Sequence, residues 1–326
     1  MELTQVLRAR KRIAPYVRRT PLVASTWLSD ATRAAVSLKL ESLQLSSSFK
    51  SRGAFNAVMA RLEVGDRPLR LVTGSAGNHG RALAAAAEVF RLPLVVFTSA
   101  DAPRAKLDAI RRHGADLRAE ARDYDDAERR AKAYAAETGA DFVSPYSDAD
   151  VIAGAATIAL EMIEDAPALD ALVVPVGGGG LISGIAWTAK AVQPRIRVVG
   201  VEAAESCAFQ TSMRAGRLVE IVPGPTLADG LAGNVDPETI TFAFVQQFVD
   251  DLVTVSEDDL RAAVAGLIAH EHLVAEGAGA AGVAALVGRH VDVAGSSVGV
   301  VLSGSNIDAA RLADVLGRNR TPNPEP

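Results

Sequence analysis

Short runs of β-branched residues and leucine recur along the chain and predict strands buried on both faces. They cover residues 36–40, 71–73, 94–98, 142–143, 172–176, 198–201 and 298–302. Between them lie alanine-rich stretches whose apolar positions repeat with helical spacing. These cover residues 54–62, 81–90, 102–113, 124–138, 153–163, 182–192 and 257–272. The alternation predicts an α/β fold with mostly parallel, twisted sheets covered by helices.

Length and composition narrow the class of protein. The chain has 326 residues, which predicts about two domains, and 49% of them are hydrophobic and 22% charged, as in folded globular proteins. The net charge of −5 disfavours nucleic acid as a partner. With Cys207 as the single cysteine, no internal disulfide can form, which favours the reducing cytoplasm. No apolar stretch reaches the ~20 residues of a membrane span, so we expect no membrane contact.

Four consecutive glycines follow the strand at 172–176 and precede the helix that we expect to open at Leu181. They are Gly177, Gly178, Gly179 and Gly180. Four amides without side chains at a helix N-terminus can wrap an anion, so the stretch predicts a phosphate site. A dinucleotide site that uses Glu202 for the ribose is the alternative. The glycine spacing argues against it, because Ile182 or Ser183 stands where the last glycine is required.

Three further turns carry polar groups. Lys50 lies in a serine-rich turn and is either a solvated surface residue or, beside a phosphorylated aldehyde, a lysine that forms a Schiff base. Residues 75–80, with Asn78 and His79, precede a helix, and their amides could bind a carboxylate. For His79 alone, a packed helix-start residue is the simpler interpretation. The third turn, at residues 303–306, follows the last strand. A fourth stretch, 223–234, is rich in glycine and proline and predicts a long ordered loop.

Taken together, these segments resemble one family. Six segments are similar, in the same order, to segments of pyridoxal-phosphate enzymes with the tryptophan-synthase-β fold (fold type II). They are residues 38–44 with 48–54, 75–80, 175–181, 226–230, 276–280 and 302–306. The resemblance is to the threonine/serine dehydratase and serine racemase group. It implies a larger domain formed by residues 1–62 and 146–326. A smaller α/β domain is inserted at residues 63–145, and the cofactor lies in the cleft between the domains.

The resemblance also implies roles for individual residues. Lys50 is the Schiff-base lysine and the base at Cα, and Phe49 packs on the cofactor ring. Asn78 bonds the phenolic oxygen of pyridoxal 5'-phosphate, Gly177 to Gly180 hold its phosphate, and Ser303 faces its pyridine nitrogen. The substrate carboxylate is expected at Ser75, Ala76, Gly77, Asn78 and His79.

The function implied is β-elimination from an L-hydroxyamino acid such as threonine or serine, which yields a 2-oxo acid and ammonia. Serine racemisation, or dehydration of 3-hydroxyaspartate, phenylserine or a hydroxyectoine-derived substrate, is the alternative, and a nicotinamide-dependent oxidoreductase lies outside the class. Ala76 stands where similar racemases carry the serine that reprotonates the substrate, which favours elimination. Ala208 replaces an acidic metal ligand of the racemase branch although Glu202 is kept, so no metal is predicted. The family further implies a homodimer.

Overall fold

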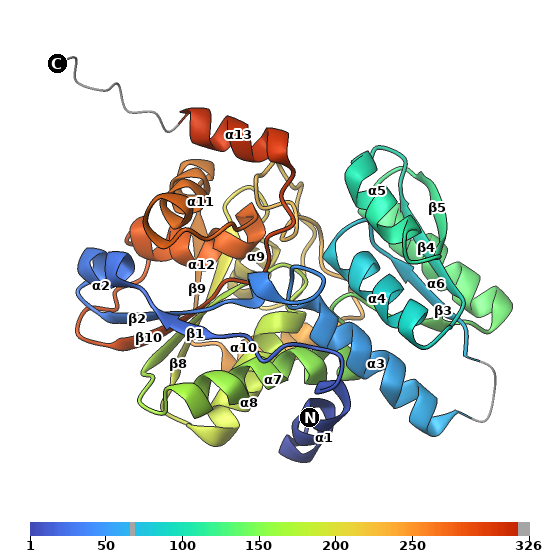
Figure 1. Cartoon of the computed structure of the whole chain (residues 1–326), viewed down its shortest axis with the longest axis horizontal. Helices are drawn as coiled ribbons and strands as arrows, with labels where there is room; N and C mark the ends of the chain where they lie inside the picture. The colour runs from blue at the N-terminus through green and yellow to red at the C-terminus, as the bar shows by residue number, and fades with distance from the viewer. Residues whose placement is uncertain (66–68, 319–326) are drawn as a thin grey trace.

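The computed structural model describes residues 1–65 and 69–318 (Figure 1). Its strands are β1 (Leu22–Ala24), β2 (Ala35–Lys39), β3 (Leu71–Gly74), β4 (Leu94–Ser99), β5 (Asp116–Ala121), β6 (Asp141–Phe142), β7 (Ala171–Pro175), β8 (Arg197–Ala203), β9 (Asp251–Val255) and β10 (Ser297–Val301). Its helices are α1 (Leu3–Ile13), α2 (Thr26–Thr32), the 3₁₀ turn η1 (Glu41–Leu43), α3 (Lys50–Val64), α4 (Asn78–Val89), α5 (Arg104–Arg111), α6 (Tyr124–Thr138), α7 (Ala149–Asp165), α8 (Gly180–Val192), α9 (Ala208–Ala215), α10 (Thr241–Phe248), α11 (Glu257–Glu271), α12 (Gly277–Val287) and α13 (Ala309–Arg318).

The strands form two separate sheets. One has six strands in the order β1-β2-β10-β7-β8-β9, and the other has four in the order β5-β4-β3-β6. All neighbouring strands are parallel except β1 and β2. The predicted α/β class with mostly parallel sheets is therefore confirmed. All strands of the smaller sheet lie within the segment predicted as the inserted domain. The domain limits themselves stay a prediction, and residues 66–68 and 319–326 of the predicted domains lie outside the described residues.

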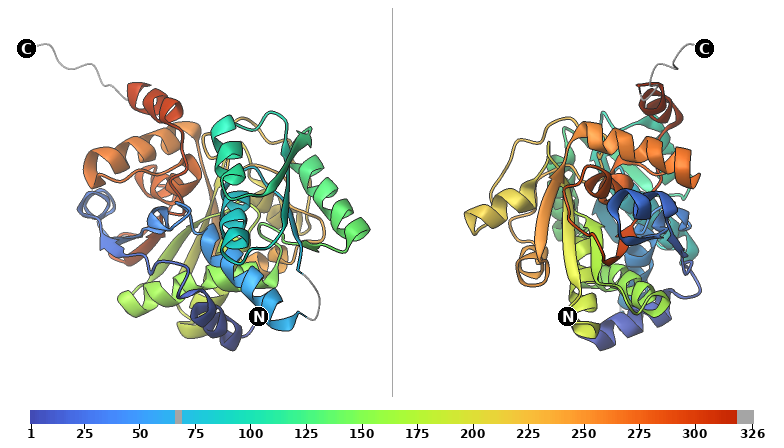
Figure 2. Two further views of the ribbon diagram at one scale, coloured as in Figure 1. Left: turned by 45° about the vertical axis from the view of Figure 1, so that its right-hand side comes forward. Right: turned by 90° about the vertical axis from the view of Figure 1, so that its left-hand side faces the viewer.

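Helices cover both faces of each sheet (Figure 2). One face of the six-stranded sheet packs on α11 and α12, and the other packs on α7 and α8. The four-stranded sheet is covered by α3 and α4 on one face and by α6 on the other. β3 and β7 are buried at every position, and β8 and β10 at every position after the first, as the apolar runs of the sequence require. Among the described residues, no helix combines the length and the apolar character that a membrane span requires.

Four helices begin earlier than the apolar pattern predicts. One is α7, which starts at Ala149 instead of residue 153, and the other three take their first turn from a loop of the site. We expected α3 from residue 54, α4 from residue 81 and α8 from Leu181, but they start at Lys50, Asn78 and Gly180. In each case the first turn is built from the polar or glycine residues of the preceding loop, which carry no apolar periodicity. Gly53 in the first turn of α3 has a packing reason, because a Cβ there would come within 2.8 Å of Val151. The loop at 223–234 has no helix or strand, as predicted.

Candidate active site

Lys50 is the first residue of α3. Its Nζ donates a hydrogen bond to the carbonyl oxygen of Pro145 over 2.7 Å, and lies 5.0 Å from the centre of the Phe49 ring. Burial lowers the pKa of Lys50 to about 8, against the opposing pull of the Glu276 carboxylate. The amine therefore loses its proton at a pH closer to neutral than a solvated lysine does, and a nucleophile or base must lose this proton. The structure places it in a cavity, unlike a solvated surface lysine.

The four glycines form a tight turn between β7 and α8. Gly179 has a φ of +84°, a left-handed conformation that favours glycine. A Cβ on Gly178 would overlap the Tyr146 ring, and one on Gly180 would come within 2.8 Å of the Tyr146 backbone. The turn thus keeps bare backbone at the N-terminus of α8, where amides and the helix dipole favour an anion. These residues fit a phosphate group.

Asn78, at the start of α4, belongs to a chain of hydrogen bonds. Its Nδ2 donates to Glu276 Oε1 over 2.6 Å, and its Oδ1 accepts from Asn306 Nδ2, also over 2.6 Å. Arg81 Nη1 donates to Asn306 Oδ1 over 2.5 Å. Burial raises the pKa of Glu276 to about 7, and the Asn78 amide opposes this shift. The chain fixes which atom of the Asn78 amide faces which partner.

The other residues of the 75–80 turn differ in their placement. His79 is buried, its Nε2 lies 3.2 Å from the Val143 carbonyl oxygen, and burial lowers its pKa to about 3. The imidazole is therefore neutral at physiological pH. Ser75 is buried behind the turn, where its Oγ accepts from the Gly77 amide over 3.3 Å. Ala76 faces a second cavity next to that of Lys50.

Most of the predicted site residues line one cavity of about 170 Å³. Its walls include Phe49, Lys50, Gly77, Asn78, His79, Gly177, Gly178, Gly179, Gly180 and Ser303. They follow β3 of the smaller sheet and β2, β7 and β10 of the larger sheet, so the cavity lies between the two sheets. Ser75 and Ala76 are not in its lining. The neighbouring cavity of about 380 Å³ shares Gly77, Asn78, Asp229 and Glu276 with it.

The cavity contains residues that the sequence reasoning did not select. Tyr124, Tyr146, Asn234 and Glu276 all line it. Glu276 lay within one of the matched segments, and its place before an apolar, glycine-rich helix was a usable signal. The two tyrosines gave no signal of this kind, because each stands alone in a loop or at a helix start, far from Lys50 in sequence.

Glu202 serves the local structure. Its carboxylate accepts hydrogen bonds from the backbone amides of Phe209 and Gln210, over 2.8 and 2.7 Å, at the start of α9. Burial raises the pKa of Glu202 to about 7, and these two amides oppose the shift. Within residues 1–65 and 69–318, no three His, Cys, Asp or Glu side chains are grouped so that they could hold a metal ion. Glu202 is thus engaged in capping a helix.

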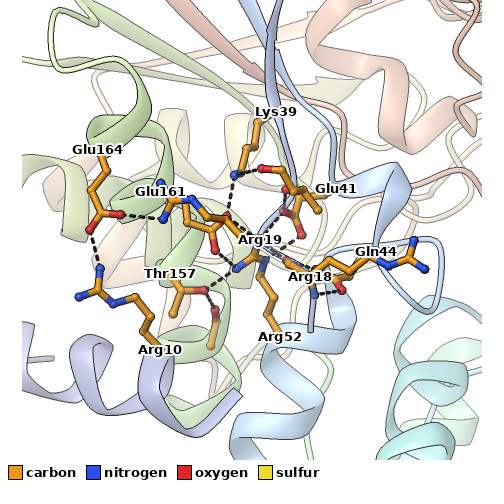
Figure 3. A network of polar contacts seen from close by, with 12 residues as sticks. Arg10, Arg18, Arg19, Lys39, Glu41, Gln44, Arg52, Thr157, Glu161 and Glu164 are labelled. Atoms are coloured by element: carbon orange, nitrogen blue, oxygen red, sulfur yellow. Dashed lines mark hydrogen bonds and ion pairs between the residues drawn. The ribbon is translucent and has the colours of Figure 1, made fainter. Parts of the chain in front are cut away.

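A buried ionic cluster lies beside the start of α3 (Figure 3). The Arg52 guanidinium donates to both oxygens of Glu41 and both oxygens of Glu161, and Lys39 Nζ donates to Glu161 over 2.6 Å. None of these four side chains is more than 7% exposed. Two positive and two negative charges thus balance one another, and one of the positive charges, Arg52, stands two residues after Lys50 in the sequence.

The site has the features of one class of enzyme. A partly buried lysine with a lowered pKa, a glycine cradle suited to a phosphate and a cavity that joins them fit a phosphorylated aldehyde cofactor held through a Schiff base. Residues 13–304 match the model of the family described as pyridoxal-phosphate dependent enzyme. The chain belongs to this family, and the predicted family, fold class and pyridoxal 5'-phosphate cofactor are confirmed.

Relatives with named activities cover nearly the whole chain. An L-threonine ammonia-lyase of Thermotoga maritima is 39% identical over 97% of this chain and 78% of its own length. An L-threo-3-hydroxyaspartate ammonia-lyase of Saccharomyces cerevisiae is 37% identical over 95% of each chain. Among solved structures, maize serine racemase superposes with a TM-score of 0.89 at 31% identity, over 97% of each chain.

Proposed function

We propose that the protein is an ammonia-lyase that eliminates the β-hydroxyl group of L-threonine or L-serine to give a 2-oxo acid and ammonia. The observation that carries this proposal is the cavity in which Lys50 and the four glycines meet. The similarity to an L-threonine ammonia-lyase over nearly the whole chain supports the same reaction. Lyase activity requires a base at Cα, and Lys50 is the residue suited to it.

The roles of the chain's own residues follow from their positions. Gly177 to Gly180 would hold the cofactor phosphate, Phe49 would pack on its ring and Asn78 would bond its phenolic oxygen. When bound, pyridoxal phosphate supplies a ring that withdraws electrons from Cα. Ser303 in the cavity wall offers a neutral hydroxyl to the ring nitrogen, which favours elimination over transamination.

The substrate is expected to bind through its carboxylate at the 75–79 turn. The turn ends at the N-terminus of α4, where backbone amides attract an anion. Lys50 then takes the Cα proton. Its pKa of about 8 lets the amine accept that proton and return it near neutral pH. His79 stays neutral, so it is expected to contribute hydrogen bonding rather than charge.

Racemisation is the second candidate function, because maize serine racemase is similar to this chain. Racemisation needs a proton donor on the face of the substrate opposite Lys50. Ala76 offers only a methyl group, and His79 is buried against Val143. We therefore propose that elimination dominates. Chiral chromatography of reactions with L-serine separates the two, since D-serine formed as fast as pyruvate would reverse this choice.

The deciding experiment is an assay of the purified holoenzyme for ammonia and 2-oxo acid. L-Threonine, L-serine, phenylserine and L-threo-3-hydroxyaspartate form the panel. We expect turnover with L-threonine or L-serine, and the Lys50→Ala variant serves as the blank. Absence of both products with every substrate would overturn the proposal.

Assembly and location extend the proposal. We propose a homodimer in the cytoplasm, with the domain limits at residues 62/63 and 145/146. Light scattering of the holoenzyme tests the first point, and a monomer with full activity would contradict it.

A further inference from the structure

One wall of the Lys50 cavity consists of two tyrosines. Tyr124 opens α6, and Tyr146 follows β6. The Tyr146 hydroxyl accepts a hydrogen bond from the Asp236 amide over 3.0 Å, which fixes the long loop against this wall. Asn234 of that loop lines the same cavity. The wall therefore presents neutral polar groups on an aromatic surface.

Acidic groups stand directly behind this wall. Glu128, one turn along α6, is only 7% exposed, and its carboxylate is close enough to Tyr124 to act on the pKa of the phenol. Burial and the nearby Glu128 raise the pKa of Tyr124, so the phenol stays protonated. Lys132 lies 3.5 Å from Glu128 and also pairs with Asp236. Lys132 is thus shared between two carboxylates.

The cavity offers no spare cation to a ligand. Of the described side chains that line it, Lys50 is the cationic one, while Asp229 and Glu276 are acidic. The nearest cations of the neighbouring cavity are engaged. Lys106 and Arg311 both bind Asp229, over 2.6 and 3.3 Å. Arg81 donates to the amide oxygen of Asn306.

We propose that this wall selects substrates with an uncharged side chain, and that Tyr124, with Glu128 one turn behind it on α6, is its specificity-determining residue. The inference rests on the proposed function. The 75–79 turn provides for one carboxylate, the α-carboxylate common to all amino acids. A second carboxylate on Cβ would face Tyr124 and Glu276, with Glu128 behind the wall and no cation in the described lining besides Lys50. Like charges at close range oppose binding. L-Threonine and L-serine fit this cavity, whereas 3-hydroxyaspartate does not.

The selectivity is measured on the unmodified holoenzyme. We expect kcat/KM for L-threonine or L-serine to exceed that for L-threo-3-hydroxyaspartate by at least about 100-fold. Binding gives an independent readout, because calorimetry with L-alanine and L-aspartate needs no leaving group. L-Alanine should bind at least about tenfold more tightly than L-aspartate. An equal or reversed order in both measurements would overturn the inference.

A variant assigns the effect to this wall. Glu128→Gln keeps the side-chain shape and removes the charge, so the preference for neutral substrates should fall about tenfold. Glu137→Gln is the matched control, since Glu137 is exposed on the same helix, and it should leave the ratio unchanged. Equal ratios for Glu128→Gln and the control would refute the role of this pair.

The two proposals fail differently. Ammonia release that favours 3-hydroxyaspartate would overturn the selectivity and leave the lyase intact. If no substrate releases ammonia, the proposed function fails. The calorimetric ratio of the unmodified holoenzyme then still decides the selectivity, and it does so even if Glu128→Gln does not fold.

Discussion

The buried cluster around Arg52 gives a quantitative prediction for Glu161→Gln. Glu161 accepts hydrogen bonds of 2.6 to 2.8 Å from Lys39 and from both terminal nitrogens of Arg52. The variant keeps the shape of the side chain but removes one negative charge. Two cations then face Glu41 alone, which leaves one buried positive charge without a partner (Figure 3).

The size of the effect follows from burial. Breaking a buried ion pair by removing one partner costs about 3–5 kcal/mol. The matched control is Glu164→Gln on the same helix. Glu164 also binds two arginines, Arg10 and Arg19, but it is 45% exposed. Solvent screens such a pair, so the control should lose less than about 1 kcal/mol.

The assay is thermal unfolding of both variants and the unmodified protein, followed by tryptophan fluorescence and near-ultraviolet circular dichroism. At about 2 °C per kcal/mol for a chain of this size, Glu161→Gln should lower the melting temperature by about 6–10 °C. The control should lower it by no more than about 2 °C. Equal shifts for the two variants would refute the reasoning, because burial would then not decide the cost.

Three further predictions concern the site. Burial lowers the pKa of Lys50 to about 8, so the rate at which the cofactor-free protein captures added pyridoxal phosphate should increase as the pH rises from 7 to 9. A rate that does not change with pH would contradict this. Borohydride reduction and peptide mapping should place the adduct on Lys50. Gly178→Ala forces the Tyr146 ring to move and should weaken cofactor binding about 10–100-fold by absorbance titration, whereas Gly317→Ala, with open space around it, should bind normally. Ala76→Ser should raise the ratio of D-serine to pyruvate formed from L-serine, and an unchanged ratio would show that the methyl group only packs the turn.

The strands that the sequence failed to predict share a position. The sequence predicts every strand in the interior of either sheet. It misses β1, β5 and β9, each at the edge of a sheet. Edge strands face solvent along one side and tolerate polar residues, as the partly exposed positions of β5 and β9 show. They therefore lack the continuous apolar run that marks a strand covered on both faces.

The residues of the site also fall into those that the sequence predicts and those that it does not. Backbone features such as the four glycines can be recognised in the sequence itself. A Cβ would meet Tyr146 at Gly178 and Gly180 and Phe209 at Gly179, so the turn requires glycine at each of these positions. No local sequence feature identifies the tyrosine wall. Tyr124 and Tyr146 reach Lys50 only through the packing of α6 and of the loop after β6. No single segment holds that information.

The start of α3 shows how partners decide what a buried cation does. Lys50 and Arg52 stand two residues apart, and burial acts to lower the pKa of both. For Arg52, the contacts with Glu41 and Glu161 outweigh burial and raise the pKa, so its charge is fixed. For Lys50, only the more distant Glu276 opposes burial, and the pKa falls to about 8. Because the cluster neutralises itself, it can anchor the first turn of α3 while leaving the Lys50 amine free to exchange its proton.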